Sequence, residues 1–405
     1  MTLVRRYAVL RSVGLAVLLL NGFTAQAQFD STPRQILHVG FEESLRDDGP
    51  YGAYFLYYWN MANVPATNQF LRLAITPGYI NSELAFKGLL GENTDLALGA
   101  FGGLYGNNYR EVRDGNYYRT ESFDGNGGGG NLSIYHRLNP GSRIPLTAVL
   151  RGSVNYATFD NTSDTANNFV MPHNQPFNTL RAGLRWGGIE PILNPVLATE
   201  VSGWYELVER PHSGLYGFSD DRRLEATSQR MFGRALIRYT TPRWQHYITA
   251  GLQGGTVLNA DRFSAYRLGG TLQYTREFSS DIPGYFFQEL SAKNFGLLNA
   301  SYTIPFGAAR QWNVTGSGAA ALVDYVDNTG QSGAFNSGVG VGLGYSAPNR
   351  RWKVTSLVGY GFEAQRSYGS GGYSAALAFQ YNFGTTKFAS DDGFEKLQRK
   401  SGVIP

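Results

Sequence analysis

Residues 373–383, YSAALAFQYNF, decide the fold class of this chain. Successive side chains of a β-strand point to opposite faces of the sheet, so the residues of one face recur with a period of two. One face of this stretch is apolar and comprises Tyr373, Ala375, Leu377, Phe379, Tyr381 and Phe383. The other face carries only serine, alanine, glutamine and asparagine. This pattern is typical of a strand that has lipid on one side and a polar lumen on the other.

The same alternation recurs upstream. It predicts strands near residues 52–62, 69–88, 94–107, 130–138, 145–159, 178–188, 196–209, 230–241, 246–257, 294–306, 311–325, 337–346, 351–363 and 372–383. We therefore expect an all-β fold, a transmembrane antiparallel up-and-down β-barrel of about fourteen strands, with sixteen as the alternative. In hydrocarbon every backbone N–H and C=O needs an internal partner, so the first and last strands should pair.

The connections between these strands fall into two classes that alternate from Gly91 onward. One class is short and turn-like, as at 139–142, 190–195 and 347–349, and the other is mostly longer and polar, as at 108–129, 211–229 and 259–293. This order predicts short periplasmic turns, longer external loops and both chain ends in the periplasm. Only the connection from Asn63 to Asn68 is short where an external loop is expected.

The N-terminus reads as a secretory signal. Arg5, Arg6 and Arg11 form a basic start, residues 13–20 are apolar, and Ala25-Gln-Ala27 is a small-residue cleavage site. We expect a signal peptide over residues 1–27, a short periplasmic segment over 28–50, the barrel over 51–383 and a periplasmic C-terminal tail over 384–405.

Composition narrows the function classes. The 405 residues include no cysteine, 51 glycines, 14% aromatic and 16% charged residues. A disulfide scaffold is excluded, and the glycine and aromatic content exceeds that of an ordinary soluble domain. Removing the signal removes three arginines, so the formal charge falls from +4 to +1. We expect no nucleic-acid partner.

Charged residues on the predicted inner faces form a lumen lining. Inward placement is favoured because a charge that faces lipid at mid-depth costs about 2–4 kcal/mol. This lining could select anions, lock an inserted loop, or form ion pairs that only stiffen the barrel. Its members are Arg72, Arg151, Arg181, Arg185, Arg234, Arg238, Glu200 and Glu206, joined by Glu83.

Catalytic and metal sites are not indicated. Five histidines are present, but none forms a metal-spaced pair such as H-x-x-x-H, and there is no cysteine. We predict no catalytic residue, no metal, no cofactor and no enzymatic activity.

A motif in the longest connection carries a family resemblance. Leu268-Gly269-Gly270 is followed by Pro283-Gly284-Tyr285, then by Glu289 and by five strands. The last strand ends on the aromatic signal Phe379, Tyr381 and Phe383. The final third of the chain thereby resembles the barrel of the outer-membrane assembly-factor superfamily, the BamA/TamA-type bacterial surface antigens. The resemblance implies that this long loop folds into the lumen.

Three features depart from that family. Pro283 occupies the place of the family's loop-locking arginine, so Glu289 and the lumen arginines would have to hold the loop differently. Only residues 28–50 precede the predicted barrel, which leaves no room for periplasmic POTRA domains. The family's barrels usually have sixteen strands, whereas the alternation here predicts about fourteen.

Three functions are therefore considered. The leading one is a BamA/TamA-like barrel of the Gram-negative cell outer membrane with a transport or envelope-structural role. The alternatives are a passive porin-like channel for small solutes and a lipid-modifying barrel enzyme. Expected partners are outer-membrane lipid and lipopolysaccharide, the barrel assembly machinery during insertion, and a periplasmic partner for the C-terminal tail.

Overall fold

The structure is a computed structural model that describes residues 33–383 except 105–107, 143, 189–196, 242, 273–279, 332 and 350. The predicted signal peptide, the C-terminal tail and the turn at 190–195 lie outside the described residues.

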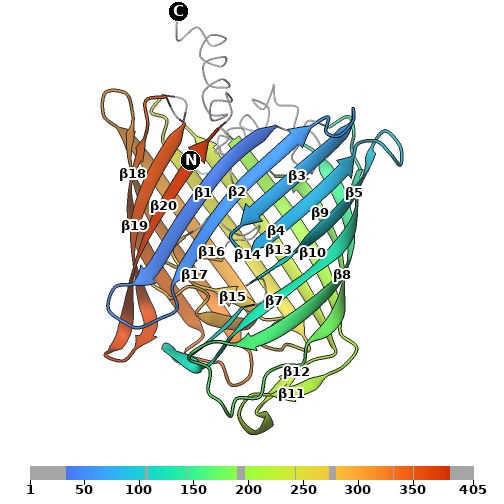
Figure 1. The fold of residues 1–405 in the computed structure, drawn as a ribbon. Helices are drawn as coiled ribbons and strands as arrows, with labels where there is room; N and C mark the ends of the chain where they lie inside the picture. The colour runs from blue at the N-terminus through green and yellow to red at the C-terminus, as the bar shows by residue number, and fades with distance from the viewer. Residues whose placement is uncertain are drawn as a thin grey trace, which may run out of the picture.

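Sixteen antiparallel strands form one closed barrel (Figure 1). Closure comes from β1 and β20, which pair over nine residues from Ile36–Asn382 to Ser44–Ser374. The wall strands are β1 (Arg34–Ser44), β2 (Gly52–Ala62), β3 (Gln69–Thr76), β4 (Tyr79–Phe86), β5 (Thr94–Gly103), β7 (Asn116–Arg137), β8 (Leu146–Asn161), β9 (Gln175–Gly187), β10 (Leu197–Glu209), β13 (Thr227–Thr240), β14 (Tyr247–Leu258), β16 (Leu290–Phe306), β17 (Trp312–Tyr325), β18 (Phe335–Ser346), β19 (Trp352–Arg366) and β20 (Gly369–Asn382).

Short elements occupy the long connections at one end of the barrel. They are β6 (Tyr109–Arg113), β11 (Gly214–Tyr216), η1 (Phe218–Asp220), β12 (Arg222–Leu224) and β15 (Tyr266–Leu268). We call this end the long-loop end and the opposite one the short-turn end. Figure 1 shows β11 and β12 beyond the long-loop end, and the start of β1 and the end of β20 at the short-turn end.

The expected fourteen strands become sixteen for two reasons. Residues 34–44, assigned to a periplasmic segment, form β1, so the barrel starts before residue 51. The run 69–88 is two strands, β3 and β4, joined by the two-residue turn Pro77-Gly78. With both strands counted, the connection at 63–68 falls at the short-turn end, so its short length is no longer an exception. The predicted loop at 108–129 was also wrong in part, because β7 continues through it and pairs with β5, β6 and β8.

The two faces of the wall differ as the alternation predicts. In β18 Val339, Val341 and Leu343 are 47%, 64% and 44% exposed, while the glycines between them face inward. In β20 Leu377 is 53% exposed, whereas Ala376 and Ala378 are buried. The outer face is thus a continuous apolar surface. No helix among the described residues is long and apolar enough to cross a membrane.

Aromatic rings form a row across neighbouring strands at the short-turn end. The Trp312 ring lies 4.8 Å from that of Tyr345, which lies 5.5 Å from that of Trp352, centroid to centroid. Trp352 continues to Phe379 at 6.4 Å. This row crosses four strands, β17 to β20, and is typical of the aromatic girdles of transmembrane barrels.

The outer face gives a depth test within one strand. We expect Val341→Arg, in the middle of β18, to destabilise the barrel folded in a bilayer by about 2–4 kcal/mol. Phe335→Arg lies on the same face at the end of the strand, where the cost should be about 0–1 kcal/mol. Denaturant titrations in lipid vesicles measure both values, and equal costs would contradict the placement of β18.

Candidate functional site in the barrel lumen

The long connection between β14 and β16 packs against the inner wall. Leu268, Ile282 and Leu290 are buried to 1% exposure or less. Their cluster includes wall residues of β14, β16 and β17, namely Val257, Leu297, Ala319, Ala321 and Val323. β15 extends this contact by pairing with β16 through Leu268 and Leu290. The described parts of this connection are therefore packed as firmly as a protein core.

The Leu268-Gly269-Gly270 motif is fixed by a carboxylate of β1. Glu42 Oε2 accepts hydrogen bonds from the backbone N–H groups of Thr271 and Leu272, the latter at 2.8 Å. Gly270 has φ +108°, and a Cβ there would lie 2.7 Å from Glu42 Oε1. Only glycine suits this position, because its φ is positive and the carboxylate occupies the space of a side chain.

The Pro283-Gly284-Tyr285 motif lies directly on the backbone of β19. Gly284 has φ +87°, and a Cβ there would lie 1.9 Å from the backbone nitrogen of Gly361. The Gly284 N–H donates to Ser374 Oγ at 3.1 Å, and Tyr285 donates to Asn336 Oδ1 at 3.2 Å. The motif thereby contacts the inward faces of β18, β19 and β20.

A buried ion pair joins this segment to the wall. Glu289 of the segment accepts from Arg366 of β19 at 2.8 Å, and both side chains are 0% exposed. Arg366 also donates to the Gly284 carbonyl at 3.2 Å and lies 3.7 Å from the centroid of the Phe286 ring. Glu289 further accepts from the Phe286 N–H at 2.7 Å and from Gln331 at 2.8 Å. Compared with the family pattern, the polarity is reversed, since the arginine stands on the wall and the carboxylate on the loop.

Glu83 anchors the first group of lumen charges. It accepts from Arg72 at 2.6 Å, from Tyr135 at 2.7 Å and from Arg151 at 3.3 Å. These residues come from β3, β4, β7 and β8, and Arg151 also donates to the Tyr135 hydroxyl at 2.7 Å. A carboxylate can reach strands on both sides of β5 only from the concave face, so this group lies inside the barrel.

Two further carboxylates continue the pattern along β10. Glu200 pairs with Arg185 of β9 at 2.9 Å and with Arg234 of β13 at 2.7 Å. Glu206 contacts Arg181 of β9 at 3.6 Å and Arg230 of β13 at 3.0 Å. Among these, Arg230 was missed by the sequence reasoning, although it shares the parity of the predicted Arg234 and Arg238.

Charged and aromatic residues also form a cap at the long-loop end. The cap comprises β6 with the start of β7, residues 166–171, β11, β12 and residues 261–265. Its aromatic core contains Tyr109, Phe123, Phe169 and Tyr216. Glu111 accepts from Arg262 at 3.1 Å, and Glu121 is held by Arg113 at 2.7 Å and by the buried Arg222. Arg262 thus ties the loop segment to the cap.

The cap carboxylate Glu111 is held in its charged form. Burial alone favours the neutral acid, but the guanidinium groups of Arg262 and Arg222 outweigh it and hold the pKa of Glu111 below its ordinary value. The side chain of Glu111 is fully buried and forms ion pairs with both Arg222 and Arg262. Protonation of Glu111 would therefore remove one ion-pair partner from each of these arginines.

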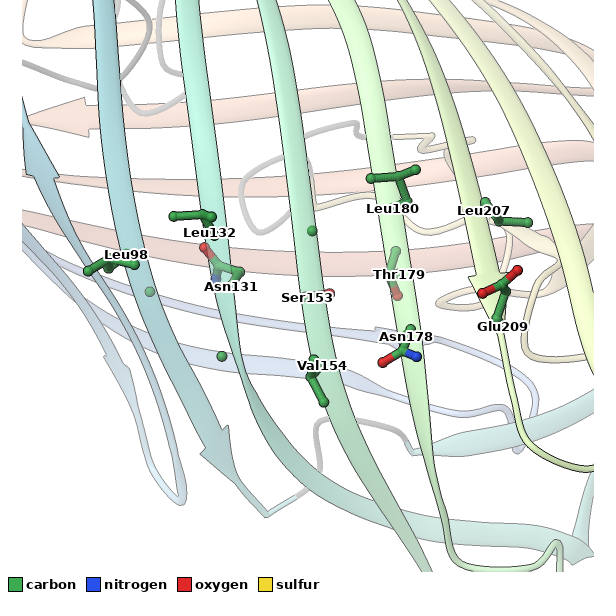
Figure 2. A pocket seen from close by; sticks show the side chains of 13 residues that line it. Leu98, Asn131, Leu132, Ser153, Val154, Asn178, Thr179, Leu180, Leu207 and Glu209 are labelled. Carbon is green, nitrogen blue, oxygen red and sulfur yellow. The ribbon is translucent and has the colours of Figure 1, made fainter. Parts of the chain in front are cut away.

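A groove on the wall belongs to the outside of the barrel. It has a volume of about 740 Å³ and crosses β5, β7, β8 and β9 (Figure 2). Leu98, Leu132, Val154 and Leu180 line it and alternate along their strands with the inward residues. Gly152 contributes to the hollow, because a Cβ there would meet no atom within 4 Å. This groove therefore lies on the outer face of the barrel and not in the lumen.

The predicted site residues fall into three groups. Arg72, Arg151, Arg181, Arg185, Arg234, Glu200 and Glu206 lie in the carboxylate groups described above, and Arg238 shares the face of Arg234 on β13. Leu268, Gly269, Gly270, Pro283, Gly284, Tyr285 and Glu289 lie together in the docked segment. Phe379, Tyr381 and Phe383 lie beside β1, where the Phe383 N–H donates to the Gln35 carbonyl at 3.0 Å.

Two residues of the docking site were not predicted. Glu42 falls in residues 28–50, which were predicted to be a periplasmic segment and which in part form β1. Arg366 lies beyond residue 363, the predicted end of its strand. Extending the alternation from the outward-facing Phe362 would also have placed Arg366 on the outer face. A bulge between Gly361 and Gln365 shifts the register of β19 and turns Arg366 inward.

The closed barrel, with its apolar outer face and charged lumen, defines a β-barrel of the outer-membrane type. Its fold is similar to CdiB from Acinetobacter baumannii, with a TM-score of 0.58 at 12% identity over 86% of this chain and 60% of that one. CdiB from Escherichia coli gives a TM-score of 0.56 at 11% identity, over 88% of this chain and 64% of that one. BamA from Haemophilus ducreyi lacking POTRA domains 1-3 gives 0.55 at 8% identity, over 91% and 78%.

These structures confirm the predicted resemblance to BamA-type barrels at the level of the fold. No protein-family model and no curated protein matches the chain. Shared activity does not follow from the fold alone.

The Glu289–Arg366 pair predicts how the segment is held. Breaking a buried ion pair from one side costs about 3–5 kcal/mol. We expect Arg366→Gln to lower the amide hydrogen-exchange protection of residues 282–290 by roughly a hundredfold or more. The double variant Glu289→Gln/Arg366→Gln should recover part of this loss. Arg223→Gln, whose side chain is 62% exposed on β12, serves as the control. Unchanged protection in Arg366→Gln would contradict the lock.

The cap predicts a loss of stability in acid. Because the folded-state pKa of Glu111 lies below the unfolded-state value, its contribution is complete above about pH 4.3 and is lost as the pH falls through the folded-state value. We expect protection of the β11–β12 amides, corrected for intrinsic exchange, to fall in that range. Glu111→Gln should be less protected at neutral pH and should show a weaker acid response. If Glu111→Gln loses protection in acid as much as the wild type does, the acid response comes from another group and the prediction is contradicted.

Proposed function

We propose that this protein is an integral barrel of the bacterial outer membrane in which residues 259–272 and 280–289 occupy the lumen and control passage through it. Its role is transport across, or maintenance of, the envelope, without catalysis. Short turns face the periplasm and the cap faces the outside. Lipid and lipopolysaccharide surround the wall, the barrel assembly machinery inserts it, and the C-terminal tail meets a periplasmic partner.

The observation that carries this proposal is the Glu289–Arg366 pair. Two fully buried charges are costly unless their geometry is fixed on all sides, and here the pair is completed by the Gly284 carbonyl, the Phe286 N–H and Gln331. Such a pair specifies one position for the segment rather than merely adding stability. A gate needs a defined closed state of this kind.

A second contact supports the same docking. Thr271 Oγ1 lies 2.6 Å from Ser374 Oγ, and both residues are buried. The first belongs to the segment and the second to the wall strand β20. Together with the contact to Glu42 on β1, this contact shows that the segment binds both strands of the closing pair, β1 and β20.

The absence of native cysteine permits a direct test of gating. We expect Arg366→Gln to raise single-channel conductance in planar bilayers, because Glu289 loses its buried partner and the segment is released from the wall. Adding Thr271→Cys and Ser374→Cys should suppress this increase under oxidation, and reduction should restore it.

Thr271→Cys alone in the same background is the matched control and should not respond to oxidant. Conductance that stays the same whether the disulfide is formed or reduced would overturn the gating role. Failure of the two cysteines to cross-link would overturn the docked position itself.

A further inference from the structure

Three carboxylates in the lumen each have two arginine partners. Each of the carboxylates Glu83, Glu200 and Glu206 contacts two arginines of neighbouring strands. The three groups therefore hold six guanidinium groups against three carboxylates, a formal excess of three positive charges. We call them the arginine wall: Arg72, Arg151, Arg181, Arg185, Arg230 and Arg234 with Glu83, Glu200 and Glu206.

Within this wall the arginines lie in front of the carboxylates. The side chains of Arg72 and Arg151 are each 30% exposed, whereas that of Glu83 is 6% exposed. The same order holds for Arg230 at 30% and Glu206 at 20%, and for Arg185 at 14% and Glu200 at 1%. Each carboxylate is thus less exposed to the lumen than the arginines that it contacts, by a wide margin at Glu83 and a narrow one at Glu206.

The opposite wall does not offset this charge. The inward residues of β16 to β18 are mostly small or uncharged, such as Leu297, Ala321 and Gly340, and the docked segment lies against them. Two carboxylates of that half, Glu42 and Glu289, are buried in contacts with the segment or its partners, and a third, Glu363 of β19, accepts from the N–H and hydroxyl of Ser337. The lumen is thus positive on one side.

We propose that the arginine wall is an anion-binding surface that takes small solutes bearing carboxylate or phosphate groups. Guanidinium groups present several N–H donors in a plane that matches the oxygens of both anions. Low-dielectric walls of one charge sign also raise the local concentration of the opposite ion. The buried carboxylates keep the guanidinium planes in place between binding events. This inference depends on the barrel and not on the gating role of the segment.

A single cysteine can report the potential at this wall. Ser153 faces the lumen on β8, two residues from Arg151, and pairs with Thr179 of β9. In Ser153→Cys we would compare modification rates by an anionic and a cationic methanethiosulfonate in a non-ionic maltoside detergent at low salt. The detergent carries no phosphate, so lipid headgroups are removed as a source of the anion. Inorganic phosphate should then slow the anionic reagent more than chloride does at equal ionic strength.

The key variant keeps every carboxylate paired. Arg151→Gln, Arg181→Gln and Arg185→Gln together leave Glu83 with Arg72, Glu206 with Arg230 and Glu200 with Arg234. We expect the ratio of anionic to cationic rates to fall roughly tenfold, as removal of a potential of one or more kT predicts. The matched control is Lys87→Gln, Arg223→Gln and Arg310→Gln, which removes the same charge from exposed positions and should leave the ratio unchanged.

Two results would overturn the proposal. One is an unchanged ratio in the key variant. The other is failure of a neutral methanethiosulfonate to modify Ser153→Cys, which would show that solutes do not reach the wall. Neither result bears on the conductance test of the docked segment, so the two proposals fail separately.

Discussion

The structure depends on one constraint: in hydrocarbon, every backbone N–H and C=O must find its partner within the protein. A sheet meets this condition only by closing, and here closure rests on the nine residue pairs between β1 and β20. Without β1, the strand β20 would present an open edge to lipid. The apolar outer face and the aromatic row at the short-turn end follow from the same surroundings.

Closure also decides where charge can lie. The outer face excludes it, so the arginines and carboxylates of the wall gather in the lumen, where strands far apart in sequence bring them into contact. Glu83 of β4 meets Arg151 of β8 only because the wall is concave. The docked segment solves the same problem differently, by burying one ion pair, Glu289 with Arg366, which also bonds to the Gly284 carbonyl, the Phe286 N–H and the Gln331 side chain.

Alternation in sequence was enough to predict the barrel, its faces and most of its strands, because the two sides of each strand meet different solvents. It failed where that signal was interrupted. β1 carries Arg34, His38 and Glu42 on its inner face and so resembles a soluble segment, and the break at Pro77-Gly78 is too short to show between two apolar strands. Parity placed the lumen arginines on one face, but it carries no information on which carboxylate each would meet. That depends on register across strands, and for Arg366 on a bulge that no local pattern announces.

The closing strand pair is the claim on which everything else rests, and disulfide mapping tests it directly. Val39 lies opposite Phe379 in the β1–β20 register, so the pair Val39→Cys and Phe379→Cys should cross-link efficiently in the folded barrel. Pairing Phe379→Cys with Phe55→Cys of β2 should not cross-link, because β1 lies between those strands. Efficient cross-linking of Phe55→Cys instead of Val39→Cys would show that β2 closes the barrel, and would contradict the sixteen-stranded account.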